Sequence, residues 1–364
     1  MSRAMLKQVA RLVCAGLIGL GAWTGNAGAA EPALFTGQAL DFERSSDKVV
    51  GVYVANWAPS RRVDELPSGA VTHILYAFLR ACGPGQLPKD APKCEGRQDF
   101  ELGSGPIDRE FDAAFARLKA RAPHVKVLAS VGGWGGSDPF FHLANDPARR
   151  AIFAASAARF LREHPSFDGI DIDWEHPGGN GAANGVQLGS PADGQGYADL
   201  MLDLRRALDR ATAETGRLFM ITSAVNPIEM IAKRINFRAA EPALDLVFMM
   251  SYDFYGGWSE RVGHHSTLAS SGPQADDSLQ RAVANLRAAG LPASKLVAGV
   301  AMYGRGFSGA ASAATGASTP TTPTSAGGSR RRSPPSWTDS GTTGSTCGHR
   351  SGSRACGCRA WTTW

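Results

Sequence analysis

Outside its two ends, this 364-residue sequence has few cysteines and no excess of basic residues. The formal net charge of +5 comes from the termini. Residues 1–30 hold three basic residues and no acid, and residues 308–364 hold six arginines and one acid, which leaves 29 basic and 32 acidic residues between them. No basic face that could bind phosphates is expected there, so the composition argues against a nucleic-acid partner.

The sequence also lacks an apolar run of the roughly 20 residues that cross a bilayer as a helix. Near the N-terminus, Arg3 and Lys7 precede an apolar stretch at residues 12–23, and small residues follow it at 25–30. This order is typical of an export signal rather than of a membrane anchor. We therefore expect cleavage after Ala29 or Ala30, secretion to the periplasm or the medium, and no stable membrane association afterwards.

Cysteine is scarce in the part that would remain after cleavage. Of the six cysteines, one lies within the signal, and three lie beyond residue 340 without a zinc-binding spacing. Cys82 and Cys94 bracket a segment rich in proline and glycine. In an oxidising compartment they are expected to form a disulfide that closes this loop, with two free thiols as the alternative. Neither a metal nor a cofactor is expected.

No G-x-G-x-x-G motif follows the first predicted strand, so a dinucleotide-binding fold lacks support. With 43% hydrophobic residues, the chain can form one large α/β barrel or two smaller domains. Short β-rich segments alternate with amphipathic helical ones, which indicates a parallel sheet with right-handed crossovers, either an open doubly wound sheet or a (β/α)8 barrel. The predicted strands are residues 49–55, 71–79, 125–133, 167–175, 218–225, 244–252 and 295–303, and the predicted helices are 108–121, 147–163, 196–214 and 276–289.

Aliphatic residues almost disappear after residue 307. Residues 308–364 are rich in Ser, Thr, Gly, Pro and Arg, so they offer neither an eighth strand nor a closing helix. We expect three parts: a signal in residues 1–30, a folded body in residues 31–307, and a tail in residues 308–364 that is either disordered or translated out of frame. An incomplete barrel would have unpaired edges on its first and seventh strands.

Acidic residues interrupt segment 167–175, which otherwise has the residues of a buried strand. Side chains alternate along a strand, so Asp171, Asp173 and Glu175 would share one face and the apolar residues between them the other. Like carboxylates roughly 7 Å apart in apolar surroundings cannot all ionise, so some keep a proton near neutral pH. Such a group can serve as a general acid. A salt-bridged or metal-binding cluster is the alternative, but no histidine-rich motif accompanies it.

The segment DGIDIDWE at residues 168–175 resembles the D-x-x-D-x-D-x-E signature of family 18 glycoside hydrolases, the chitinases. Three further segments match the family in order: SVGGW at residues 130–134, MSYDFYGGW at 250–258, and YGRGF at 303–307. The resemblance covers residues 49–307, and overall the sequence is most similar to secreted bacterial chitinases. It implies a (β/α)8 TIM barrel, here without its eighth strand and closing helix.

The resemblance also implies a retaining glycosidase in which the substrate takes part in catalysis. Glu175 would protonate the glycosidic oxygen and later activate water, while the acetamido oxygen of the substrate attacks the anomeric carbon. Asp173 would orient the acetamido group, and Asp171 would share a proton with Asp173. Tyr252 would donate a hydrogen bond to the acetamido oxygen.

A cleft lined with aromatic and polar side chains follows from the same resemblance. Flat aromatic faces suit the C–H surfaces of pyranose rings, with ordinary packing as the alternative, and an ion pair is the alternative for Arg305. The glycine-rich loop 176–196 is expected to form one wall, and the adjacent His264 and His265 are given no catalytic role. The expected substrate-binding residues are Tyr53, Trp57, Phe78, Gly133, Trp134, Met250, Asp253, Tyr303 and Arg305.

The expected function is an exported, monomeric chitinase that hydrolyses β-1,4 linkages in chitin or chito-oligosaccharides. Three other functions stay open: an endo-β-N-acetylglucosaminidase, a non-catalytic chitin-binding lectin on the same scaffold, and an inactive truncated chitinase. Lectins of this kind lack the terminal Glu of the signature, so the presence of Glu175 favours catalysis.

Overall fold

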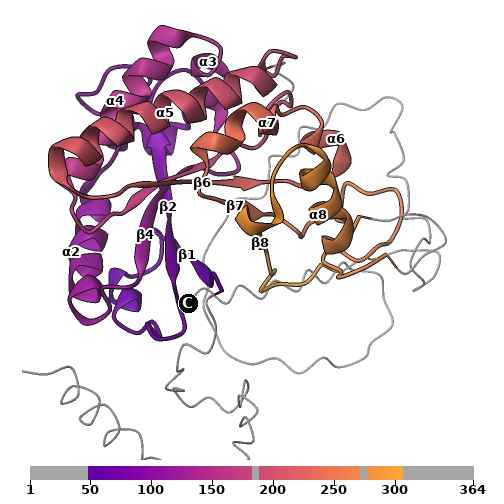
Figure 1. Ribbon diagram of the computed structural model, residues 1–364, viewed down its shortest axis with the longest axis horizontal. Helices are drawn as coiled ribbons and strands as arrows, with labels where there is room; N and C mark the ends of the chain where they lie inside the picture. Colours follow the sequence, from indigo (N-terminus) through magenta and orange to yellow (C-terminus); the bar gives the residue numbers. More distant parts are fainter. Residues whose placement is uncertain (1–47, 183–187, 271–276, 306–364) are drawn as a thin grey trace, which may run out of the picture. The chain divides into compact units, whose positions relative to one another are not determined.

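The computed structural model describes residues 48–182, 188–270 and 277–305 (Figure 1). The predicted export signal, the tail and residues 183–187 of the glycine-rich loop lie outside the described residues. None of the described helices is long and apolar enough to cross a membrane.

Seven parallel strands form one sheet, and each pairs with the strand that precedes it along the sheet path. The path never reverses direction, which is the order of a barrel, whereas a doubly wound sheet reverses at its switch point. A two-residue strand, β3 (Leu102–Gly103), pairs antiparallel with the end of β2. The parallel strands are β1 (Gly51–Ala55), β2 (His73–Ala81), β4 (Lys126–Gly132), β5 (Gly169–Asp173), β6 (Met220–Val225), β7 (Leu246–Met249) and β8 (Leu296–Ala298).

The helices that follow the strands begin at local capping signals. At the start of α4, the side chain of Asp146 accepts hydrogen bonds from the N–H groups of Ala148 and Arg149, and Pro147 occupies the first helical position. Figure 1 shows α2, α4 and α5 along the outer side of the strands. The helices are α2 (Pro106–Arg121), α3 (Asp138–Leu143), α4 (Pro147–Glu163), α5 (Asp193–Thr215), α6 (Glu229–Ala232), α7 (Phe237–Ala240) and α8 (Leu279–Ala288), with 3-10 turns η1 (Ser60–Val63), η2 (Pro88–Lys93), η3 (Glu241–Ala243) and η4 (Ala293–Lys295).

The main core lies between the sheet and these helices. Ile170 and Ile172 of β5 are fully buried, and the ring of Trp174 lies 5.2 Å from that of Phe141 in α3 and 6.5 Å from that of Tyr197 in α5. The apolar face of the acidic strand therefore points outward toward the helices, as the alternation predicts. A second, smaller cluster of Leu75, Leu128 and Phe248 lies on the other face of the sheet.

The seven predicted strands are all present, although their ends differ. β8 ends at Ala298, five residues before the predicted strand does, and β5 ends at Asp173. Glu175 therefore lies two residues beyond β5. Its N–H donates to the Ser137 hydroxyl (3.2 Å) rather than to a neighbouring strand. The short elements α3, α6 and α7 were not predicted, since a helix of four to six residues gives little periodicity.

Within the described ranges, β1 pairs only with β2 and β8 only with β7. The fold is therefore an incomplete (β/α)8 barrel over residues 48–305. The carboxyl ends of its parallel strands lie at one edge of the sheet, where barrel enzymes carry their active sites.

Candidate active site

Asp171 points from β5 into the sheet's inner face, between two hydroxyl groups from the neighbouring strands. Its Oδ2 accepts a hydrogen bond from Ser130 of β4 (2.7 Å), and its Oδ1 accepts one from Thr222 of β6 (2.6 Å). Burial raises the pKa of Asp171 to about 6, although these hydroxyls and that of Tyr53 favour the charged form. Asp171 thus titrates close to neutral pH.

Asp173, two residues further along the same face, is buried with fewer hydrogen bonds than Asp171. Its Oδ1 has no hydrogen-bond partner among the described residues. Burial raises the pKa of Asp173 well above its ordinary value, and the negative charges of Glu175 and Asp171 raise it further. The negative charges of its neighbours therefore disfavour the ionisation of Asp173.

Glu175 lies just past the end of β5 with a side chain that is 15% exposed. Burial raises its pKa to about 7, although the N–H of Trp134 favours the carboxylate. The side chain of the neighbouring His176 is equally 15% exposed, and its partial burial lowers its pKa to about 4, so it is neutral when Glu175 titrates. A partly exposed carboxyl with a pKa near 7 is suited to give a proton and take it back.

Two glycines at the end of β4 allow the backbone to approach the acids. Gly132 has φ +114° and Gly133 has φ +79°. A Cβ on Gly132 would collide with the carbonyl oxygen of Asp173, and a Cβ on Gly133 would lie 2.8 Å from the Phe78 ring. The Gly133 N–H also donates to the Asp173 carbonyl (2.8 Å). These glycines hold β4 and β5 together at the point where the acidic face emerges.

Two tyrosines complete the surroundings of the acids. Tyr53 of β1 and Tyr252, which follows β7, both have raised pKa values, first because their hydroxyl groups are buried and then because of the nearby negative charges, among them Asp173. Both hydroxyls therefore stay protonated and can donate hydrogen bonds toward the acidic face. The Tyr53 residue as a whole is nevertheless partly exposed.

Exposed aromatic rings surround this edge of the sheet. Trp57 and Trp134 are each 65% exposed and Tyr53 is 40% exposed. The half-buried Phe78 ring lies 6.4 Å from that of Tyr53 and 6.5 Å from that of Trp57. Exposed rings of this kind offer flat apolar faces next to polar groups, as sugar-binding sites do.

Arg305 and Asp253 lie together on the other side of the acids. Arg305 Nε contacts Asp253 Oδ1 at 2.6 Å, so in this structure Arg305 forms an ion pair, the alternative to substrate binding that the sequence left open. Although burial raises the pKa of Asp253, hydrogen bonds from Arg305 and Tyr303 lower it overall. The ring of Tyr303 lies 6.2 Å from that of Tyr252, and Met250 is half-buried at the end of β7.

The sequence matches glycosyl hydrolases family 18 over residues 49–345. It is 36% identical over 312 residues to chitinase A of Pseudoalteromonas piscicida, covering 72% of this chain and 38% of that protein. It is 34% identical over 301 residues to a chitinase of Autographa californica nuclear polyhedrosis virus, covering 73% and 54%. The solved structure of chitinase ChiA74 from Bacillus thuringiensis is similar with a TM-score of 0.65 at 28% identity, over 77% of this chain and 52% of that one.

The chain belongs to glycosyl hydrolases family 18. It spans 38% and 54% of the length of the two chitinases that it matches. A family 18 N-acetylglucosaminidase from Paenibacillus barengoltzii is also similar, with a TM-score of 0.57 and 28% identity over 70% of this chain and 68% of that one. The family's fold is the TIM barrel, in agreement with the non-reversing strand order.

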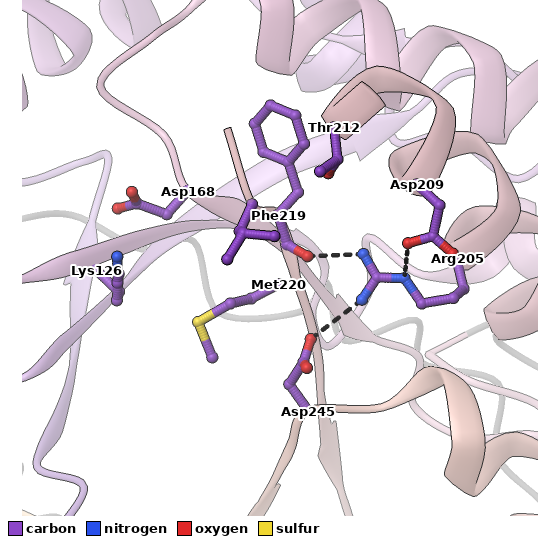
Figure 2. A pocket seen from close by; sticks show the side chains of 9 residues that line it. Lys126, Asp168, Arg205, Asp209, Thr212, Phe219, Met220 and Asp245 are labelled. Atoms are coloured by element: carbon purple, nitrogen blue, oxygen red, sulfur yellow. Dashed lines mark hydrogen bonds and ion pairs between the residues drawn. The ribbon is translucent and has the colours of Figure 1, made fainter. Parts of the chain in front are cut away.

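A cavity of about 340 Å³ lies at the opposite edge of the sheet, where β4, β6 and β7 begin (Figure 2). Its arginine is already paired with the two aspartates beside it. Arg205 Nε contacts Asp209 at 3.0 Å, its Nη1 contacts Asp245 at 3.3 Å, and its Nη2 donates to the Phe219 carbonyl at 2.6 Å. Ion pairs at the amino ends of barrel strands contribute to stability rather than to catalysis.

Sequence reasoning missed some residues that the structure brings to the site. Arg80 at the end of β2 has a side chain only 12% exposed, and its contacts reach the end of β4. Trp258 is the last residue of the matched segment 250–258, but it was not among the expected binding residues. It is 63% exposed, and the Arg305 guanidinium lies 4.7 Å from the centre of its ring. His265 stacks 5.2 Å from the Tyr303 ring. Among the described residues, no cluster of His, Cys, Asp and Glu has the geometry to hold a metal ion.

Proposed function

We propose that this chain is a chitinase that hydrolyses β-1,4 linkages between N-acetylglucosamine units with retention of configuration. The observation that carries the proposal is the row of Asp171, Asp173 and Glu175 at the carboxyl end of β5, where burial raises the pKa of Asp171 to about 6 and that of Glu175 to about 7. Chito-oligosaccharides are the substrate class, as the names of the similar chitinases suggest.

Glu175 is the general acid of the proposed reaction. Because burial raises its pKa to about 7, Glu175 can hold near neutral pH the proton that the leaving glycosidic oxygen needs. As the bond to the leaving sugar breaks, the acetamido oxygen of the retained sugar bonds to the anomeric carbon and forms a cyclic oxazolinium ion. The ionised Glu175 then takes a proton from water, which opens the ring and leaves the anomeric configuration unchanged.

Asp171 and Asp173 stabilise the positive charge of that intermediate. The acetamido N–H of the substrate donates to Asp173, whose proton passes to Asp171, and the single negative charge of the pair stabilises the oxazolinium ion. Tyr252 donates its phenolic hydrogen to the acetamido oxygen and so directs it toward the anomeric carbon. The substrate itself thus replaces a second carboxylate nucleophile.

The remaining expected residues form the sugar-binding surface of the proposal. Trp57 and Trp134, each 65% exposed, offer stacking faces, and Phe78 packs under the site beside Gly133. Asp253, Arg305, Tyr303 and Met250 line the other side. We also propose export through residues 1–30, a catalytic body in residues 31–307 and a monomeric state.

The test is turnover of chitohexaose by the full chain and by Glu175→Gln. Removal of the general acid is expected to lower kcat by roughly 100-fold or more while binding is retained. Glu163→Gln, an exposed residue at the end of α4, is the matched control and should keep wild-type turnover. Proton NMR of the fresh product should show the β-anomer first.

Binding of chitohexaose without turnover by the wild-type chain would support the lectin instead. Equal turnover by wild type and Glu175→Gln would remove Glu175 from the reaction. Release of intact glycans from glycoproteins, with no cleavage of chitohexaose, would support the endo-β-N-acetylglucosaminidase.

A further inference from the structure

Arg80 is a largely buried cation that the reaction described above does not use. It lies near the end of β2 with a side chain only 12% exposed. Its Nη1 donates to the carbonyl oxygen of Gly132 at 2.5 Å, and its Nε donates to Asp90 Oδ2 at 2.8 Å. A buried guanidinium held at two points has a fixed position, unlike one that projects into solvent.

The loop that holds Arg80 is itself closed by a disulfide. Asp90 lies in η2, between Cys82 and Cys94, whose sulfur atoms are bonded. Lys93 of the same turn donates to the carbonyl oxygen of Phe78 at 3.0 Å and to Asp108 at 3.2 Å. Asp90 and Lys93 thus connect this loop to Arg80 and to Phe78 near the end of β2.

The other end of Arg80 lies next to the acids. Gly132, whose carbonyl it holds, is the residue of β4 that pairs with Asp173 of β5. The next N–H, that of Gly133, donates to the Asp173 carbonyl. The positive charge of Arg80 favours the ionised form of Asp173 and so opposes the increase of its pKa by burial and by the neighbouring acids. The ionisable groups around Asp173 are Asp171, Glu175, Tyr53, Tyr252 and Arg80.

We propose that Arg80 is a positioning residue of this site: held by Asp90 of the disulfide-closed loop, it fixes the end of β4 against Asp173 and supplies the positive charge that favours a negative charge on Asp173. The proposal rests on the chitinase function only for its kinetic consequence. Without that cation, Asp173 would stay protonated to a higher pH, and the oxazolinium ion would lose its counter-charge.

The test measures the titration of Asp173 directly, by 13C NMR of the carboxyl groups in the full chain. In Arg80→Met, loss of the positive charge should move the Asp173 titration upward by roughly one pH unit. In Asp90→Asn the side-chain oxygen still accepts from Arg80, but the negative charge that offsets it is gone. The titration should then move downward. Arg162→Met, which removes an exposed cation at the end of α4, should leave it unchanged.

The opposite directions separate this role from a purely structural one. Loss of folding stability alone would lower activity in both variants without moving the titration in opposite directions. Shifts of the same sign, or no shift in either variant, would overturn the proposal. If Arg80→Met does not fold, Arg80→Lys and Asp90→Asn carry the test: the lysine variant should titrate near wild type, and the asparagine variant should still shift downward.

Kinetics keep this proposal separate from the chitinase assignment. If the chain turns over chitohexaose, the acidic limb of the kcat profile should follow the NMR shifts, and kcat of Arg80→Met should fall by about tenfold with KM little changed. If the chain does not turn over any chito-oligosaccharide but the titrations shift as expected, the function is wrong and the role of Arg80 beside Asp173 stands.

Discussion

Three carboxyl groups on one short segment meet three different environments. Asp171 accepts hydrogen bonds from Ser130 and Thr222, Asp173 has one oxygen without a partner among the described residues, and Glu175 lies past the end of the strand. Their pKa values are all raised by burial, but only Glu175 combines a value near 7 with partial exposure. This combination favours Glu175 over its neighbours as the group that exchanges protons with the substrate.

The raised pKa of Glu175 also makes the fold less stable at high pH. The native state binds this proton with a pKa of about 7, whereas the unfolded chain has a value of about 4.5. Between these values the native state holds more protons, so stability falls as the pH rises from about 4.5 to 7 and the full cost remains above pH 7.

Glu175→Gln removes this cost. We expect the variant to be more stable than wild type at pH 8, by on the order of 2–3 kcal/mol, and to have nearly the same stability at pH 4. Urea unfolding at the two pH values measures the difference, with Glu163→Gln as the control that should change neither value. An equal effect of Glu175→Gln at both pH values would contradict the raised pKa.

At the scale of the elements, the contact between β4 and β5 decides the geometry of the site. The strands pair in parallel register from Leu128 opposite Gly169 to Gly132 opposite Asp173. Positive φ values at Gly132 and Gly133 then turn the chain away from the sheet. Only glycine adopts this backbone without strain while leaving room for the Asp173 carbonyl.

Gly132→Ala should therefore destabilise the fold strongly, because the new Cβ collides with the Asp173 carbonyl in addition to straining the backbone. We expect a loss of about 3 kcal/mol or more in urea unfolding. Gly216→Ala is the matched control, since Gly216 ends α5 with φ +71° and has no neighbouring atom within 4 Å of a new Cβ. It should cost only about 1 kcal/mol. Equal losses in the two variants would show that the close approach at Gly132 is relieved at little cost.

Predicting the elements from the sequence worked best where the pattern was long or strongly apolar. All seven strands and the four longer helices were anticipated, because alternation and 3.6-residue periodicity are local properties of the chain. α4 has the predicted bounds, with a proline at its first position and Asp146 as its cap. Strand ends were less predictable, since a strand stops where its neighbour no longer offers a hydrogen-bond partner.

At the scale of the whole molecule, the described sheet has two edges. β1 and β8 each pair with one neighbour within residues 48–305, and β8 has only three residues. The family match extends to residue 345, beyond these strands. Unpaired edges leave backbone groups to water, and they are the first parts of a sheet to open.

Hydrogen exchange of the full chain should distinguish the edges from the centre of this sheet. We expect amides of β1 and β8 to exchange substantially faster than those of β5, which is paired on both sides. Mass spectrometry of peptic peptides that cover 51–55, 169–173 and 296–298 measures this. Equally slow exchange in β5 and β8 would mean that a further strand covers β8, and the incomplete barrel would be wrong.

The sequence by itself determined the family, the order of the strands along the chain and the set of acids, because residue type, spacing and periodicity are local and survive without coordinates. Only the tertiary structure decided which distant groups meet those acids: the hydroxyls of Ser130 and Thr222 around Asp171, the ion pair of Arg305 with Asp253, and Arg80 beside Asp173. Such contacts depend on strand register and on where each strand ends, which a pattern of residue types along one chain does not specify.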